Sequence, residues 1–142
     1  MTSSVFDRDA EDDYLVKYFR FTMKMATTLE FIKAQSAKGG GDFQEAFHTA
    51  LNMVLSELQW SKTARVRIAF LLLDAPPHNN TNIIRELQEA IVAAAKRGIK
   101  IIPITASGID TDTEYLMRSF SIATNGSYVF ITNDSGIGND HL

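Results

Sequence analysis

The feature that most constrains the fold is a short apolar run, Ile68 to Leu73, followed by Asp74-Ala75-Pro76-Pro77. The run is far too short to cross a bilayer, and the two prolines prevent it from continuing. An unbroken apolar run of this length is typical of a parallel β-strand that is buried on both faces. We therefore expect a strand over residues 66–73 inside a sheet that helices cover.

Strand and helix patterns alternate from about residue 66 onward, with short loops between them. Such alternation implies right-handed crossovers and a mostly parallel sheet with helices on both faces. The predicted fold class is therefore α/β, with a doubly wound, Rossmann-like sheet. After the first apolar strand we expect a helix capped by Asn80 or Thr81 and stopped by Gly98. A strand over 99–104 follows, and then a helix that begins with a capping box at Thr111–Glu114. A turn at Asn125-Gly126 leads to the last strand, over 128–132.

The N-terminal half predicts a strand and two helices. Its expected elements are a loop over 1–13 that holds a strand remnant at 5–9, a strand over 14–21, a helix over 24–37, and a helix from Phe43 to near Trp60. Gly39-Gly40-Gly41 separates the two helices, and Asp42 is placed to cap the second one. A length of 142 residues fits one domain, which we place at 14–142 after the N-terminal loop.

Composition excludes several classes of protein and partner. The chain has 45% hydrophobic and 22% charged residues, as an ordinary globular domain does, and without cysteine it is no disulfide scaffold. A net charge of −3 argues against a nucleic-acid partner, because phosphate binding needs a basic surface. The N-terminal residues do not resemble a signal peptide, so a cytoplasmic location is the default expectation and no membrane partner is expected.

Two carboxylates lie where open α/β sheets bind ligands, outside the carboxyl ends of the strands. Asp74 directly follows the most apolar strand, and Asp42 follows the triple glycine at the start of a helix. Carboxylates with neighbouring hydroxyls or waters are the ligands of hard cations such as Mg²⁺ or Ca²⁺. Each residue also has a purely structural interpretation, Asp42 as a helix cap and Asp74 as a turn former. His78, at the same sheet end as Asp74, is the one histidine of interest.

Two segments, in this order, resemble the von Willebrand factor type A (vWA) domain. They are Gly39-Gly40-Gly41-Asp42-Phe43-Gln44-Glu45-Ala46 and Phe70-Leu71-Leu72-Leu73-Asp74-Ala75-Pro76-Pro77-His78, with a helix to Trp60 between them. More narrowly, they are similar to the branch with a Gly-Gly-Gly-Asp-x-Pro-Glu-Ala loop and an Asp-Ala-Pro-Pro-His strand end. The resemblance covers the chain from about residue 5 to its end, and it implies a metal-ion-dependent adhesion site.

In the family, this site combines Asp-x-Ser-x-Ser after the first strand, a Thr before the third helix and an Asp after the fourth strand. The resemblance implies that Asp74 is the last of these ligands. Gly41 stands where the family has Thr, with Asp42 beside it as a substitute or outer ligand. The implied metal is Mg²⁺, with Ca²⁺ or Mn²⁺ as alternatives, and the implied partner is a protein that supplies a carboxylate to it. Because no Asp-x-Ser-x-Ser occurs in this sequence, we expect weak metal binding or none.

The resemblance also implies that the first strand, the first helix and most of the second strand of the family's sheet are missing, as in a C-terminal fragment. The family's strand order, 3-2-1-4-5-6, would leave the strand over 14–21 two places from the strand over 66–73, unless the two pair directly. An open edge on so apolar a strand favours self-association.

The predicted function is a non-enzymatic protein-interaction module with an incomplete metal site. The alternative is a small α/β hydrolase in which Asp74 is the nucleophile or a metal ligand and His78 is the acid/base.

Overall fold

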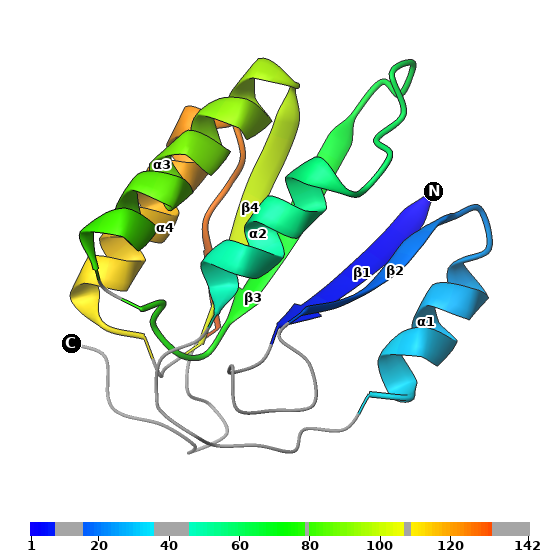
Figure 1. The fold of residues 1–142 in the computed structure, drawn as a ribbon, viewed down its shortest axis with the longest axis horizontal. Coiled ribbons are helices and arrows are strands. Elements are labelled where there is room, and N and C mark those ends of the chain that lie inside the picture. Colours follow the sequence, from blue (N-terminus) through cyan, green and yellow to red (C-terminus); the bar gives the residue numbers. More distant parts are fainter. Residues whose placement is uncertain (8–15, 36–45, 79, 107–108, 132–142) are drawn as a thin grey trace. The chain divides into compact units, whose positions relative to one another are not determined.

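A computed structural model describes residues 1–7, 16–35, 46–78, 80–106 and 109–131 (Figure 1). The chain divides into two compact units, Met1–Thr63 and Ala64–Leu142, each with its own sheet and helices. The mixture of helices with a parallel sheet and a small antiparallel sheet confirms the predicted α/β class. Among the described helices, none is both long enough and apolar enough to span a membrane.

The N-terminal unit is an antiparallel hairpin with two helices. Its elements are β1 (Thr2–Asp7), β2 (Val16–Thr22), α1 (Met25–Lys33) and α2 (Phe47–Ser56). β1 and β2 form a two-stranded sheet in which Val5 lies opposite Tyr18. Residues 2–7 are thus a strand where the sequence predicted mostly loop, because pairing with β2 satisfies their backbone. In the described residues β2 belongs to this two-stranded sheet, and the strand over 66–73 belongs to the sheet of the other unit.

Aromatic side chains hold α1 against the hairpin. The ring of Phe31, on α1, stacks on Phe19 of β2 with the ring centroids 5.1 Å apart. It also meets Phe6 of β1, with the centroids 6.0 Å apart. Farther along β2, Phe21 meets the ring of Trp60 edge-on with the centroids 5.1 Å apart. Aromatic residues of β2 therefore provide packing contacts within this unit.

Helix α2 begins later than the sequence predicts. Its first residue is Phe47, and its N-cap is Ala46, which has no side chain able to cap. The predicted cap, Asp42, lies outside the described residues together with Gly41. The buried positions of the helix recur at helical spacing and are Phe47, Ala50, Leu51 and Leu55.

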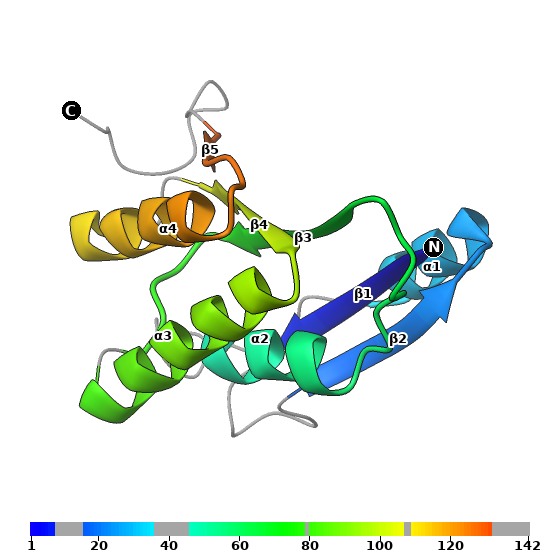
Figure 2. The ribbon, with the colours of Figure 1, turned by 90° about the horizontal axis from the view of Figure 1, so that it is seen from above.

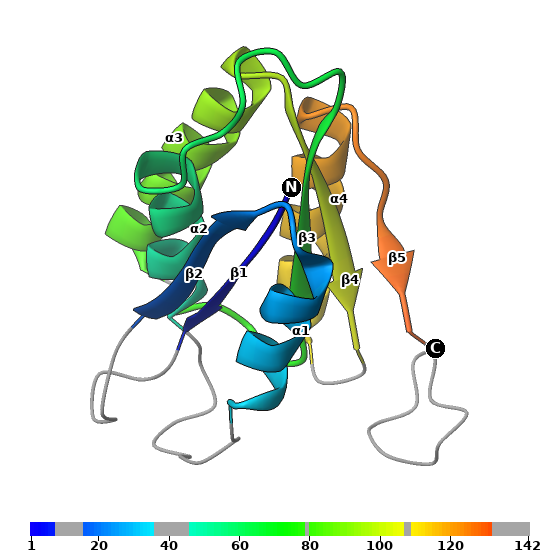
Figure 3. The same cartoon turned by 90° about the vertical axis from the view of Figure 1, so that its right-hand side faces the viewer.

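The C-terminal unit is a three-stranded parallel sheet with two helices (Figure 3). Its elements are β3 (Arg67–Leu73), α3 (Thr81–Lys96), β4 (Ile99–Thr105), α4 (Thr111–Ala123) and β5 (Val129–Phe130). The strand order is β3-β4-β5, with Phe70 opposite Ile102 and Ile104 opposite Val129. The predicted alternation of parallel strands and helices is confirmed in this unit.

Helices α3 and α4 lie on the same face of this sheet and contact each other (Figure 2). Each strand is added beside the one before it, and right-handed crossovers in one constant direction place both helices on one side. On that face Ile101 and Thr105 are fully buried, whereas Phe70 and Leu72 on the other face are exposed. The prediction that the strand over 66–73 is buried on both faces is therefore wrong.

Side chains and a glycine define the ends of the helices in this unit. Asn80, one of the two residues predicted to cap α3, does so by accepting a hydrogen bond from the N–H of the third helical residue at 3.0 Å. The cap of α4 is Asp110, which accepts from the N–H of Thr113 at 2.7 Å, so the predicted capping box headed by Thr111 is wrong by one residue. Gly98 ends α3 at φ 63°, a left-handed conformation that glycine adopts without strain.

Candidate functional site

Two parallel strands bring Asp74 to the carboxyl edge of the sheet. β3 and β4 are paired up to their last residues, Leu73 and Thr105, and the N–H of Ala106 donates to the carbonyl of Leu73 at 2.9 Å. Asp74 is the first residue beyond β3, and it is exposed. The end of the strand thus presents a carboxylate to solvent at the edge where open α/β sheets bind ligands.

The neighbouring strand ends in a hydroxyl group that is already hydrogen-bonded. Thr105 is fully buried, and its hydroxyl shares a hydrogen bond of 2.6 Å with the hydroxyl of Tyr128. Its carbonyl accepts from the N–H of Ile131 at 2.8 Å. These hydrogen bonds join the end of β4 to the β5 region at the carboxyl edge of the sheet. Sequence reasoning missed Thr105 and Tyr128, although a hydroxyl residue at the end of an apolar strand is a readable signal.

The loop that follows Asp74 is mostly buried and contains two consecutive prolines. Ala75, Pro76 and Pro77 are buried, and His78 is half-buried. The two prolines fix their own φ angles, so the conformational freedom of this loop is small. Asp74 and His78 therefore lie on one short, constrained loop, and the hydrolase alternative that uses both of them stays a prediction.

The remaining predicted ligands, Gly41 and Asp42, lie outside the described residues, so the pairing of Asp42 with Asp74 also stays a prediction. A further acid near this edge, Asp110, caps α4. In the part of the chain that the structure describes, no three His, Cys, Asp or Glu side chains group as metal ligands. Asp74 alone does not fit Mg²⁺, which requires an octahedral set of oxygen ligands. By itself Asp74 can accept hydrogen bonds or pair with a cationic group of a partner.

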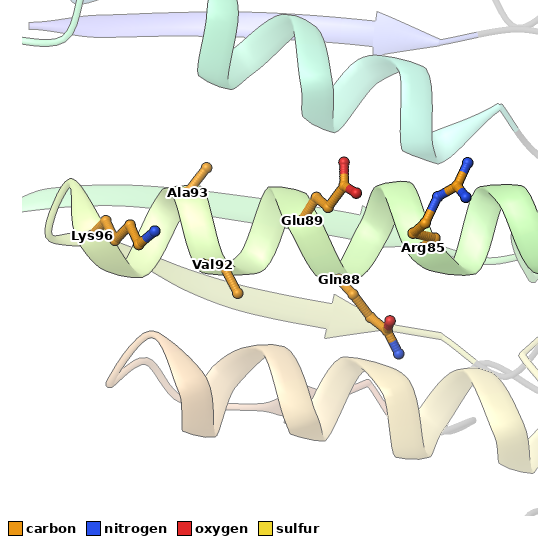
Figure 4. A pocket seen from close by; sticks show the side chains of 6 residues that line it. All are labelled: Arg85, Gln88, Glu89, Val92, Ala93 and Lys96. Atoms are coloured by element: carbon orange, nitrogen blue, oxygen red, sulfur yellow. The ribbon is translucent and has the colours of Figure 1, made fainter.

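A separate hollow lies on the outer surface of α3 (Figure 4). It has a volume of ≈ 480 Å³ and is lined by six residues of that helix: Arg85, Gln88, Glu89, Val92, Ala93 and Lys96. Val92 and Gln88 point toward the side on which α4 lies (Figure 4). Charges of both signs at helical spacing are typical of a solvated helix face. The hollow is built along α3 rather than at the carboxyl edge, so it does not support the predicted site.

Comparison with profiles of known protein families and with curated proteins finds no match to this chain. The resemblance carried by the two sequence segments therefore stays a prediction. Among the described residues, Asp74 at the carboxyl edge of the parallel sheet is the feature from which a function can be argued.

Proposed function

We propose that the chain is a vWA-like protein-interaction module, not an enzyme, whose partner binds at the carboxyl edge of the parallel sheet. The observation that carries the proposal is the position of Asp74, an exposed carboxylate directly after β3. Loops at this edge of an α/β sheet can vary in sequence without disturbing the core, which is why binding residues gather there. The parallel β3-β4-β5 order is compatible with a module of this kind.

The metal part of the proposal involves Asp42, Asp74 and Gly41. Asp42 and Asp74 would face one Mg²⁺, Ca²⁺ or Mn²⁺ ion, with Gly41 in the place of the family's hydroxyl residue. A carboxylate of the partner protein would complete the set of oxygen ligands. Because the sequence lacks Asp-x-Ser-x-Ser, two carboxylates would hold the ion weakly, or not at all without the partner.

Paramagnetic broadening by Mn²⁺ in amide NMR spectra tests where a cation binds. We expect millimolar Mn²⁺ to broaden the amides of Asp74, Ala75 and His78 first, and Asp74→Ala to abolish this. Glu89→Ala is the matched control, because it removes an exposed carboxylate from α3 and should leave the broadening unchanged. Calorimetry with Mg²⁺ should show no binding tighter than millimolar, and a micromolar affinity would mean that the site is complete.

Acetate can stand in for the carboxylate of the partner. We expect acetate to shift the amides of Asp74, Ala75 and His78 only when Mg²⁺ is present, and not in Asp74→Ala. Shifts centred instead on residues 85–96, which line the hollow on α3, would contradict the proposed binding edge.

The hydrolase alternative predicts turnover. With generic ester and phosphate substrates and added Mg²⁺, we expect no rate above the uncatalysed background. Activity that is lost in both Asp74→Ala and His78→Ala, but kept in Glu89→Ala, would replace the proposal by this alternative.

A further inference from the structure

The face of the parallel sheet opposite α3 and α4 carries a continuous apolar patch. Successive residues of a strand point to opposite faces, and the register places Phe70 beside Ile102, and Leu72 beside Ile104 and Val129. We define the open-face patch by six residues: Phe70, Leu72, Ile102, Ile104, Val129 and Ile131, the last of which directly follows β5 and donates its N–H to the carbonyl of Thr105 at 2.8 Å. Ile68 and Lys100, which lie opposite each other, form its rim at one end.

The open-face patch is unusually exposed for apolar side chains. The exposed fractions are 76% for Leu72, 59% for Phe70 and 54% for Ile131. A fully exposed aromatic side chain presents about 150–250 Å² and an aliphatic one somewhat less, so at these exposed fractions the patch with Ile68 presents on the order of 500 Å². This is near the upper end of what a typical monomer leaves in contact with water. Apolar patches of this size are often interaction sites.

We propose that a second copy of this chain covers the open-face patch, with the two sheets packed face to face about a two-fold axis. This interface is independent of the proposed binding at the carboxyl edge. Two patches together bury about 1,000 Å², which reaches the lower limit of a specific protein–protein interface. All six residues are uncharged, so two identical patches meet without an unpaired buried charge.

Charge argues against a membrane surface as the occupant. The chain has a net charge of −3, and of the residues paired across the described sheet on this face, Lys100 supplies a single positive charge at the rim. Apolar surfaces that bind anionic lipid are flanked by several Lys or Arg residues. A second copy presents an apolar face of matching size, and stacked sheets pack about 10 Å apart.

Sedimentation velocity of the full chain, from micromolar to several hundred micromolar concentration, tests the proposal. We expect a monomer–dimer equilibrium that stops at the dimer. Leu72→Lys should raise the dissociation constant at least tenfold, because it places a charge in the apolar interface. Ile131→Lys, at the opposite side of the patch, should also raise the dissociation constant at least tenfold. It provides an independent test if Leu72→Lys folds poorly.

The matched control is Ile122→Lys, which replaces an apolar residue that is 80% exposed on α4, outside the patch. It should leave the dissociation constant unchanged. Circular dichroism spectra identical to those of the wild type will show that each variant is folded. A monomer at all concentrations, a dimer that folded patch variants do not weaken, or assembly that continues beyond the dimer would each overturn the proposal.

Discussion

The two faces of the parallel sheet are built from the same strands and nearly the same kinds of residue, yet they differ in burial. On the face toward α3 and α4, Ile99 and Ile101 are fully buried, whereas Phe70 and Leu72 point to the other face and are mostly exposed. Hydrophobicity therefore does not decide which side chains form the core of this unit. The positions of the two helices decide it.

Chain topology explains the difference. β3, β4 and β5 follow one another across the sheet without reversal, so both right-handed crossovers place their helices on one side. A helix on the other face would require the strand order to reverse, or a further element to cover that face. Neither occurs in the described part of this unit. β3 therefore has one buried face, although its unbroken apolar run predicts two.

The largest expected effect comes from a matched pair of phenylalanines. Phe120 of α4 is fully buried on the covered face, so Phe120→Ala should lower the free energy of unfolding by about 3–5 kcal/mol. Phe70→Ala, on the open face, should cost about 1 kcal/mol or less at dilute protein concentration. Urea denaturation of both variants measures this, and equal losses would show that the two faces are equally buried.

The next largest effect is expected for Gly126, which lies between α4 and β5 and close to the backbone of β4. A Cβ added to Gly126 would collide with the backbone carbonyl of Ile101, so Gly126→Ala should destabilise the chain by about 1–3 kcal/mol. Gly98→Ala is the control, because its Cβ would have room beside Arg67 and only the positive φ opposes it. In thermal unfolding, Gly126→Ala should therefore have a lower Tm than Gly98→Ala. The reverse order would mean that the turn at Gly126 can move away from β4.

Thr124, close to the same turn, provides the hydrogen-bond acceptor for a backbone N–H of β4. The hydroxyl of Thr124 accepts from the N–H of Ile101 at 2.9 Å and donates to the carbonyl of Phe120 at 2.8 Å. Thr124→Val keeps the shape but leaves the buried N–H without an acceptor, at a cost of about 1–2 kcal/mol. Amide exchange at Ile101 should become faster in this variant. Ser119→Ala, which loses a hydroxyl from the same helix at a partly exposed position, should change neither stability nor exchange by a comparable amount.

The smallest effects compare two aspartates that follow parallel strands. Asp110 caps α4, so Asp110→Ala should cost about 1 kcal/mol. Asp74 is exposed and caps no helix, so Asp74→Ala should change the free energy of unfolding by about 0.5 kcal/mol or less. Denaturant titrations of the two variants measure the contrast. A large loss in Asp74→Ala would assign Asp74 a structural role and weaken its proposed role in binding.

Much of the secondary structure could be predicted from local patterns. The apolar runs over 68–73 and 99–104 predicted two strands, the Gly98 stop was placed correctly, and the cap of α3 was narrowed to Asn80 or Thr81, of which Asn80 is observed. Predictions that depend on which of several adjacent polar residues caps a helix were less accurate. Thr111 and Asp110 both suit an N-cap, and the backbone geometry selected Asp110. The first strand was read mostly as loop because its pairing with β2 is not a local property.

For the candidate site, the sequence indicated that a carboxylate follows the most apolar strand, and the structure places Asp74 there, exposed at the carboxyl edge. The hydrogen bond between Thr105 and Tyr128 could not be predicted, because the two residues are brought together only by the pairing of β4 with β5. The roles of Gly41 and Asp42 stay predictions.

The amino-acid sequence by itself determined the α/β class, the order of strands and helices after residue 66, and the carboxylate at the end of β3. These features follow from hydrophobic periodicity, caps and breakers, which act over a few neighbouring residues. Only the tertiary structure decided which face of the sheet is covered, because that depends on the order in which the strands are laid side by side. The apolar run of β3 is compatible with one buried face or with two, and the positions of α3 and α4 left Phe70 and Leu72 exposed.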